Sequence, residues 1–299
     1  NGTKLGSHTG SEIPFEFDVT DVIKQGRKNF LSVCVTNGKG MLSVFANTET
    51  AGFWDCGGIW QEVSLNVRPK AYISDVYAVS DWKTGDVRLD FTVCSTADGS
   101  VPITLNADIA DMSTGKTKCS QSGKAFTAVN GENKFSLDLK VEDFKLWDTE
   151  NPNLYTVNAS LGSEFGSYEY KSFNFGFRNI EIKNGFYYLN GKRFYLKMTH
   201  ENIYDPLIIQ GTPRNAEYLL KKLDNVKSAG FNTFRFIGTA GIPAQLDYAD
   251  RIGLLIYEES AQSWMGKNAW SDENYDKLVI RDRNHPSIII WGLLNETGS

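Results

Sequence analysis

Two patterns of hydrophobic and polar residues divide the chain. In the first part, apolar and polar residues alternate over short stretches such as 15–19 and 30–35, and a polar, glycine-containing stretch at 24–29 separates them. Alternation with a period of two is typical of strands that bury one face, and the stretch between them is typical of a turn. Residues up to about 67 are therefore predicted to form antiparallel β-structure of the sandwich or jelly-roll type.

The same pattern continues from Tyr72 to Phe177. Runs such as 87–93 and 134–140 alternate, and clusters of Gly, Asp, Ser and Asn separate the runs. About seven short strands with regular turns over roughly 105 residues are typical of an immunoglobulin-like sandwich. This segment is predicted to be a second β-domain.

After Arg178 the pattern changes to alternating strand-like and helix-like segments. Such alternation predicts a parallel sheet with crossover helices. Four strands and three intervening helices make half of an eight-stranded βα barrel, and because half a barrel leaves open sheet edges, we expect the natural chain to continue. The predicted strands are 194–198, 231–236, 254–257 and 288–294, and the predicted helices are 215–229, 242–251 and 271–283.

Composition excludes several classes of partner. The 299 residues include 31 Lys and Arg against 36 Asp and Glu, a net charge of −5. Without a basic cluster, neither nucleic acid nor an anionic membrane is an expected partner.

The sequence also lacks several other signals. No run approaches the roughly 18 apolar residues of a membrane helix, and the 4 cysteines lack the CxxC spacing of zinc or redox sites. The first residues carry no part of a secretory signal and look like the interior of a longer protein, so localisation stays open.

Asn295 and Glu296 directly follow the apolar stretch 288–294. Catalytic side chains gather at the carboxyl ends of strands in βα barrels, so a carboxyl group here can face a substrate. On spacing alone a structural role carries equal weight, because an Asn-Glu pair at a strand end can also cap the next helix or hold a surface loop.

A contiguous stretch of sequence is a more specific signal than the position of Asn295 and Glu296 after a strand. Residues 281–296, RDRNHPSIIIWGLLNE, closely resemble the signature of glycoside hydrolase family 2, the family of β-galactosidases and β-glucuronidases. Upstream, 190–197 resembles the start of the family's barrel and 229–235 its second strand, and the likeness continues through 250–259.

The resemblance extends to the amino-terminal part of the chain. Residues 14–20 and 57–63 resemble the second half of the family's jelly-roll sugar-binding domain. The implied organisation is a carboxy-terminal part of a jelly-roll over 1–69, an immunoglobulin-like sandwich over 70–179, and the first half of a TIM barrel over 180–299.

The resemblance implies hydrolysis of a β-glycosidic bond with retention, by two carboxyl groups about 5 to 5.5 Å apart. Glu296 matches the general acid/base, which must be protonated as the bond breaks and ionised when water attacks. Asn295 matches a residue that binds the sugar hydroxyl next to the reacting carbon. The nucleophile is expected on a later strand, beyond Ser299, so the segment alone is expected to be inactive.

Further site residues follow from the same resemblance. Arg235 matches an arginine near the family's catalytic carboxylates, with a structural ion pair as the alternative. His200 resembles a histidine that lines the sugar pocket. Glu258 matches a position that binds sugar or, in some β-galactosidases, a divalent cation; no cofactor is required, and Glu258 and Glu296 alone give a cation no further support. Trp264 lies in the loop after the third strand, where a sugar ring can stack, with loop packing as an equal alternative.

A β-galactosidase is the leading activity. β-Glucuronidase and β-mannosidase activities compete with it, because the substrate depends on pocket residues mostly beyond Ser299. Gly238 stands where the family commonly has an imidazole, which weakens a lactose-type assignment. A carbohydrate-binding protein without catalysis is the alternative from a different class. A carbohydrate is the expected partner, and a homo-oligomer is left open.

Overall fold

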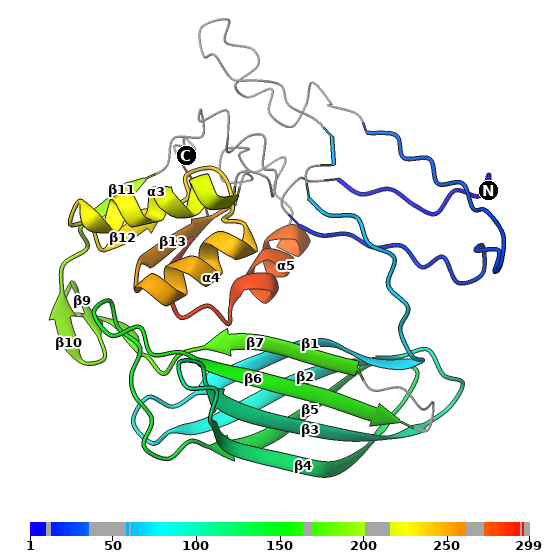
Figure 1. Cartoon of the computed structure of the whole chain (residues 1–299), viewed down its shortest axis with the longest axis horizontal. Coiled ribbons are helices and arrows are strands. Elements are labelled where there is room, and N and C mark those ends of the chain that lie inside the picture. Colours follow the sequence, from blue (N-terminus) through cyan, green and yellow to red (C-terminus); the bar gives the residue numbers. More distant parts are fainter. Residues whose placement is uncertain are drawn as a thin grey trace, which may run out of the picture.

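The computed structural model describes residues 1–9, 13–35, 58–59, 61–163, 169–200, 216–260, 272–293 and 295. A β-sandwich occupies one end of the molecule, and a parallel sheet with its helices lies beside it (Figure 1). The fold class predicted for these two parts is therefore confirmed.

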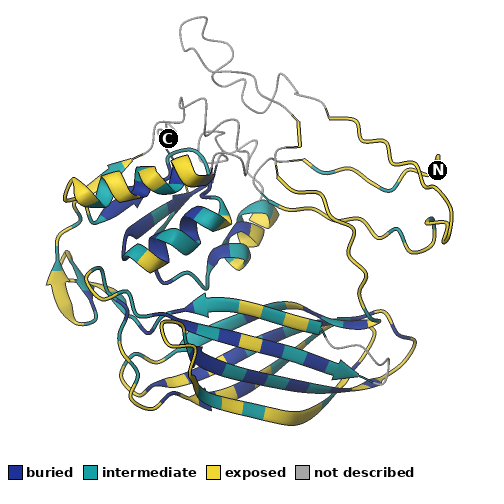
Figure 2. Cartoon of the chain, in the orientation of Figure 1, coloured by how far each residue is buried: buried dark blue, intermediate teal, exposed yellow. Residues whose placement is uncertain are grey.

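The sandwich contains seven of the described strands in two antiparallel sheets. Its core is formed by alternate residues, such as Val87, Leu89, Phe91 and Val93 of a single strand, and Figure 2 shows the resulting stripes of buried and exposed positions. This is the period-two pattern read from the sequence, turned toward a common core. One sheet has the order β1(Ala71–Ser80), β2(Asp86–Ser95), β5(Gly131–Lys140), and the other β4(Thr117–Ala128), β3(Val101–Asp111), β6(Tyr155–Ser163), β7(Glu169–Phe175).

A small antiparallel sheet connects the sandwich to the parallel sheet. It contains β8(Ile180–Lys183), β9(Phe186–Leu189) and β10(Lys192–Phe194). The strand predicted over 194–198 is therefore wrong as a single element, because Phe194 ends β10 and the first parallel strand begins only at Met198. Local apolar pattern does not distinguish two short strands separated by an irregular stretch from one continuous strand.

The parallel sheet has the order β11(Met198–His200), β12(Thr233–Arg235), β13(Leu255–Glu259), β14(Ile288–Gly292). The helices α3(Ala216–Ser228), α4(Pro243–Ile252) and α5(Asp272–Asp282) connect β11 to β14, with α3 between β11 and β12, as predicted within a few residues. α4 begins with Pro243, whose fixed φ suits the first helical turn, and ends at Gly253 in the left-handed region (φ 68°). Four parallel strands with crossover helices form part of a βα barrel.

The sandwich packs against the amino-terminal end of the parallel sheet. In the loop before β14, Asn284 Nδ2 donates to Val76 O of β1 (2.8 Å), and its Oδ1 accepts from Ala78 N (3.0 Å). Arg178 Nε donates to Pro286 O (2.9 Å), and burial lowers the pKa of the Arg178 guanidinium. Asn284 thus pairs with the backbone of β1 across the domain boundary. This contact lies at the amino-terminal end of the parallel sheet, so the opposite, carboxyl end is available for a site.

A small apolar cluster reinforces this contact. Trp147, Leu154 and Leu255 are buried together, and Trp147 Nε1 donates to Asp250 O (2.9 Å). A buried indole N–H needs such a partner. The cluster fastens the loop after β5 to α4 and β13.

The predicted jelly-roll part of 1–69 contains no strand in the residues that the structure describes. The stretches 15–19 and 30–35 alternate as noted, but their large apolar side chains are exposed, Phe30 by 76% and Leu31 by 70%. Alternation produces a strand only where partner strands complete the ladder and bury the apolar face, and the described residues provide neither. The strands predicted at 15–19 and 30–35 are thus not formed here.

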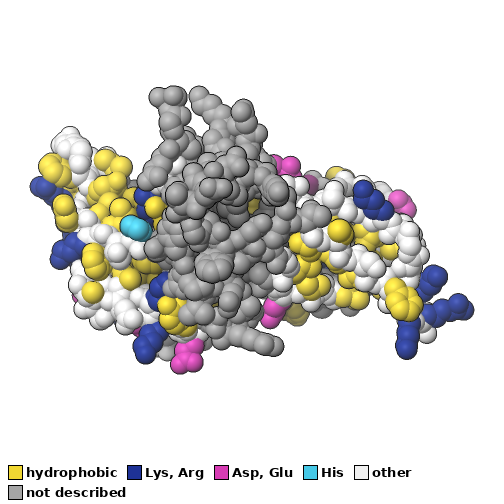
Figure 3. Space-filling view, turned by 90° about the horizontal axis from the view of Figure 1, so that it is seen from above, with side chains coloured by type: hydrophobic (Ala, Val, Ile, Leu, Met, Phe, Trp, Pro, Cys, Tyr) yellow, Lys and Arg dark blue, Asp and Glu magenta, His cyan; other side chains and the backbone are white. Residues whose placement is uncertain are grey.

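On the face seen in Figure 3, Lys and Arg side chains lie at both ends of the described part of the molecule, several of them close together at one end. None of the helices in the described ranges is both long and apolar enough to cross a membrane.

Candidate active site

Three polar side chains meet at the carboxyl end of the parallel sheet. Arg235, the last residue of β12, donates from Nε to Glu259 Oε2 (3.0 Å) and from Nη2 to Glu259 Oε1 (2.9 Å). Its Nη2 also donates to Asn295 Oδ1 (2.6 Å). The two parallel hydrogen bonds form the bidentate geometry that fixes a guanidinium in plane as well as in position. We refer to Arg235, Glu259 and Asn295 as the arginine cluster.

The alternation of strand residues explains which side chains join this cluster. Phe234 and Phe236 pack into the core beneath the helices, so Arg235 between them faces the opposite side of the sheet. On β13, Ile256 belongs to the same helix-facing core, so Glu259, three residues later, turns to the side of Arg235. The cluster is therefore set by strand register.

Burial makes the cluster electrostatically strong. The Glu259 side chain is 0% exposed and that of Arg235 21%. The guanidinium also lies over the Tyr257 ring, with Cζ 4.8 Å from the ring centroid. A buried carboxylate without a partner would be very costly, so each ion requires the other.

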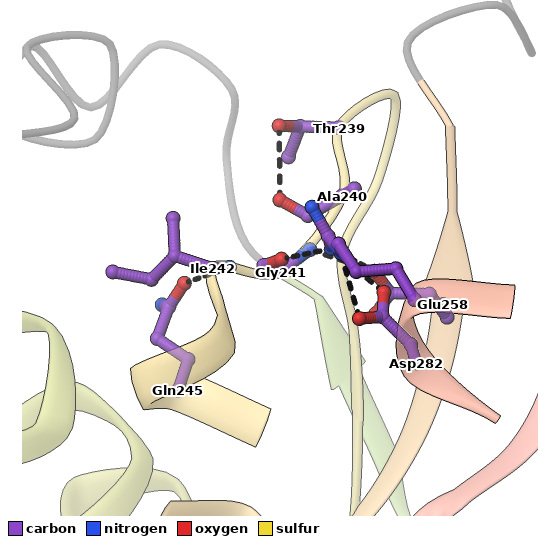
Figure 4. Close-up of polar contacts among 8 residues, drawn as sticks. Thr239, Ala240, Gly241, Ile242, Gln245, Glu258 and Asp282 are labelled. Atoms are coloured by element: carbon purple, nitrogen blue, oxygen red, sulfur yellow. Dashed lines mark hydrogen bonds and ion pairs between the residues drawn. The ribbon is translucent and has the colours of Figure 1, made fainter. Parts of the chain in front are cut away.

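Glu258 lies outside the arginine cluster, although the sequence predicts it as a sugar-binding or cation-binding residue. It faces the helices, where Oε1 accepts from Gly241 N (2.8 Å) and lies 3.9 Å from Arg281 Nη2 of α5. Figure 4 shows Glu258 beside Gly241 and Asp282, between the loop after β12 and α5. It is 0% exposed, and its neighbours in the parallel ladder put it on the side away from Arg235. The structure thus gives Glu258 a place in the helix packing.

Glu259 is the residue that the sequence interpretation missed. The signal was available, because Glu258 and Glu259 are consecutive carboxylates at a strand end and only one of them can share a face with Arg235. Choosing between them requires knowing that Arg235 pairs in register with Tyr257, two residues before Glu259. Tertiary pairing, which the sequence does not state, decides the choice.

Gly238 supports the cluster through its backbone. It has φ 64°, a left-handed conformation that favours glycine, and its N–H donates to Glu259 Oε2 (3.2 Å). The glycine that departs from the family's common imidazole therefore has a structural reason in this chain. Among the described residues, Glu259 accepts two hydrogen bonds from Arg235 and one from Gly238.

The other predicted site residues fall in different places. His200 ends β11, pairs in register with Arg235 and is exposed, which puts its backbone beside the arginine cluster. Asn295 is buried at 7% exposure within the cluster. Glu296 and Trp264 lie outside the described residues.

Tyr275 of α5 lies close to the carboxylates of β13. Burial, together with the neighbouring Tyr257, Glu258 and Glu259, raises the pKa of Tyr275 to about 12. Its phenol therefore stays neutral over the physiological range.

A separate group of potential ligand atoms lies toward the amino-terminal end of the sheet. Asp247, Asp250 and His285 each offer one atom, all within 4.8 Å of one another. His285 Nδ1 is already 2.6 Å from Asp250 Oδ2, and Asp250 Oδ1 accepts from Ser287 N (3.0 Å). These contacts satisfy Asp250 within the protein, so the geometry is that of an ion pair that holds the turn before β14.

Sequence families agree with this architecture of a β-sandwich followed by part of a βα barrel. The model of "Glycosyl hydrolases family 2" matches residues 71–178, and that of "Glycosyl hydrolases family 2, TIM barrel domain" matches residues 180–299. The chain belongs to glycosyl hydrolase family 2.

Relatives in this family carry more than one activity in their names. A Formosa agariphila protein provisionally named a beta-glucuronidase is 30% identical over 99% of this chain. A beta-galactosidase of Enterobacter cloacae is 28% identical over 100% of it. The chain spans 36% of the first relative's length and 30% of the second's.

Solved structures share the fold. A family 2 glycosyl hydrolase from Bacteroides cellulosilyticus superposes with a TM-score of 0.64 at 23% identity, over 74% of this chain and 30% of that one. The beta-glucuronidase of Bacteroides uniformis gives 0.66 at 20% identity, over 76% and 29%. At these identities the likeness establishes the arrangement of sandwich and barrel.

Proposed function

We propose that the full-length protein hydrolyses terminal β-O-glycosidic bonds with retention of configuration, and that Glu296 is its general acid/base. The observation that carries the proposal is the position of Asn295, which is held by Arg235 at the carboxyl end of the parallel sheet. Glu296 is the next residue of the chain, and side chains that leave strands at this edge of a βα barrel face the substrate.

The chemistry requires two states of one carboxyl group. Glu296 in its acid form donates a proton to the leaving oxygen while a second carboxylate attacks the anomeric carbon. In the second step, ionised Glu296 removes a proton from the attacking water as the glycosyl-enzyme bond breaks. We propose that the second carboxylate lies in another part of the full-length protein, because relatives are about three times as long as the matched segment.

Asn295 and Arg235 support this chemistry by binding. We propose that Asn295 donates a hydrogen bond to a hydroxyl of the sugar, a contact that strengthens as charge develops in the transition state. Arg235 keeps positive charge near the reacting carboxylates. His200 and Trp264 complete the proposed sugar-binding set, and Glu258 is left out because it faces the helices.

A β-galactoside is the leading proposed substrate. A β-glucuronide is the second candidate, since the relatives' names include both beta-galactosidase and beta-glucuronidase. The two sugars differ at the carbon outside the ring, where one has a hydroxymethyl group and the other a carboxylate. A homo-oligomer stays a prediction, checked by light scattering of the full-length protein.

The test is hydrolysis of nitrophenyl β-galactoside, β-glucuronide and β-mannoside by the full-length protein and its Glu296→Gln variant. Glu296→Gln should lower kcat by about 100-fold or more on these substrates, because nitrophenolate leaves without help from an acid but the second step still needs the general base that activates water. The matched control is Glu273→Gln, an exposed glutamate on α5, which should keep normal turnover. Normal turnover by Glu296→Gln contradicts the mechanism, and binding of sugar without hydrolysis by the wild type supports a carbohydrate-binding protein instead.

A further inference from the structure

The orientation of the Asn295 amide is decided by its neighbour. Arg235 Nη2 can only donate, so it selects the carbonyl end of the amide, and the 2.6 Å contact is to Oδ1. The amide nitrogen therefore points to the other side. Nδ2 is buried and has no hydrogen-bond partner among the described residues.

Such an arrangement is informative because an asparagine amide is nearly symmetric in shape. Without a donor-only neighbour, a rotation of 180° would exchange oxygen and nitrogen at little steric cost. A buried N–H group without a partner is unfavourable in the absence of a ligand. The 7% exposed Asn295 is thus held with a hydrogen-bond donor ready for an acceptor at the carboxyl edge of the sheet.

Arg235 does not hold this position alone. Glu259 binds Nε and Nη2 together, at 3.0 and 2.9 Å, and is itself fixed by Gly238 N at 3.2 Å. The Tyr257 ring lies against the guanidinium. Of these contacts, only the carboxylate sets the rotation of the guanidinium in its plane, which is what aims Nη2 at Asn295.

We propose that Glu259 is a positioning residue for substrate recognition: acting through Arg235, it fixes the Asn295 amide so that Nδ2 donates to the sugar hydroxyl next to the reacting carbon. This role rests on the proposed function. The Glu259 side chain is fully buried and shares Arg235 Nη2 with Asn295, so it acts through the guanidinium without touching the substrate.

The test compares two substrates that differ only in this hydroxyl. The full-length protein is assayed on nitrophenyl β-galactoside and its 2-deoxy counterpart, and kcat/KM for the first is divided by that for the second. In Glu259→Gln, the amide NH₂ would oppose the donors of Arg235 and displace the guanidinium. The ratio should fall by about 10-fold or more, because the contact made by the 2-hydroxyl is weakened and changes that affect both substrates alike cancel in the ratio.

Two further variants connect the effect to Asn295. Asn295→Ala should lower the ratio to a similar value, and the double variant Glu259→Gln/Asn295→Ala should lower it no further, since both changes remove one contact. Glu258→Gln is the matched control: the same change, one residue away, on the opposite face of β13. It should leave the ratio at the wild-type value.

A second variant tests the same contact without changing Glu259. If Glu259→Gln does not fold, Arg235→Lys keeps the positive charge but loses the bidentate geometry, and it should lower the ratio as well. An unchanged ratio in a folded, active Glu259→Gln or Arg235→Lys protein overturns the positioning role and leaves the proposed function intact. A wild-type protein that hydrolyses no glycoside overturns both.

Discussion

Glu258 and Glu259 are consecutive, fully buried residues of β13 whose carboxylates hold the same loop from opposite faces of the parallel sheet. Glu259 accepts from Gly238 N on the side of Arg235, and Glu258 accepts from Gly241 N on the side of the helices. One strand thereby fixes the loop after β12 at two points. This explains how a loop with a glycine in the left-handed conformation can support a rigid site.

The ion pair between Arg235 and Glu259 predicts an asymmetric response to mutation. Arg235→Met leaves the Glu259 carboxylate buried without its counter-ion and should lower the free energy of unfolding by about 3–5 kcal/mol. The double variant Arg235→Met/Glu259→Leu removes both charges and should recover most of that loss. Urea unfolding followed by tryptophan fluorescence measures both. Equal destabilisation of the single and double variants would show that shape, and not the buried charge, dominates.

Gly238→Ala tests the backbone of the site. A Cβ in the left-handed region costs about 1 kcal/mol, and relief of that strain would move the N–H away from Glu259. Both stability and kcat/KM should therefore decrease. Gly115→Ala, at φ 67° in the turn between β3 and β4, has a similar backbone cost far from the site and should affect stability alone. Unchanged kcat/KM in Gly238→Ala would show that the loop after β12 does not contribute to the reaction.

His285 predicts a pH dependence of stability. Burial alone would lower the pKa of His285, but the hydrogen bond to Asp250 and the charges of Asp250, Asp282 and Asp247 outweigh it, and the pKa is raised. Below the unfolded-state pKa of about 6.5 the imidazole is protonated in both states, and its full stabilisation is present. That stabilisation is lost as the pH rises through the folded-state pKa.

The measurement for His285 is the free energy of unfolding in urea at a series of pH values on both sides of about 6.5. His285→Gln should be less stable than the wild type at the acidic end, and the difference should shrink toward alkaline pH. Burial raises the pKa of Asp247, and the charge of His285 acts against that rise, so the wild type and the variant are compared at each pH. A difference that grows with pH would contradict the assigned ion pair.

Trp147→Phe tests the contact between sandwich and barrel. The change leaves Asp250 O without its indole donor and shrinks a fully buried side chain. We expect a loss of about 1–3 kcal/mol, measured by urea unfolding. Trp82→Phe, on a half-buried turn of the sandwich, is the matched control and should change stability by less than about 0.5 kcal/mol. Equal effects of the two substitutions would assign no special role to the Asp250 contact.

The sequence determined the kinds and order of the elements. Period-two alternation identified the strands that became the sandwich, as in the run 87–93 within β2, and the alternation of strand-like and helix-like segments identified α3, α4 and α5. These patterns can be recognised in the sequence because each strand or helix must bury one of its faces, and this requirement acts locally. The contiguous run at 281–296 likewise identified the family, since it needs no spatial information, and it marked Asn295 at a strand end.

Only the tertiary structure decided how these pieces meet. Alternation at 30–35 did not produce a strand in the described residues, because a ladder needs partners that a local pattern cannot supply. The choice between Glu258 and Glu259 depended on strand register, which turns one carboxylate to Arg235 and its neighbour to the helices. Register is set by packing between segments far apart in the chain, so the identity of the residue that orients the site became readable only once those segments were in contact.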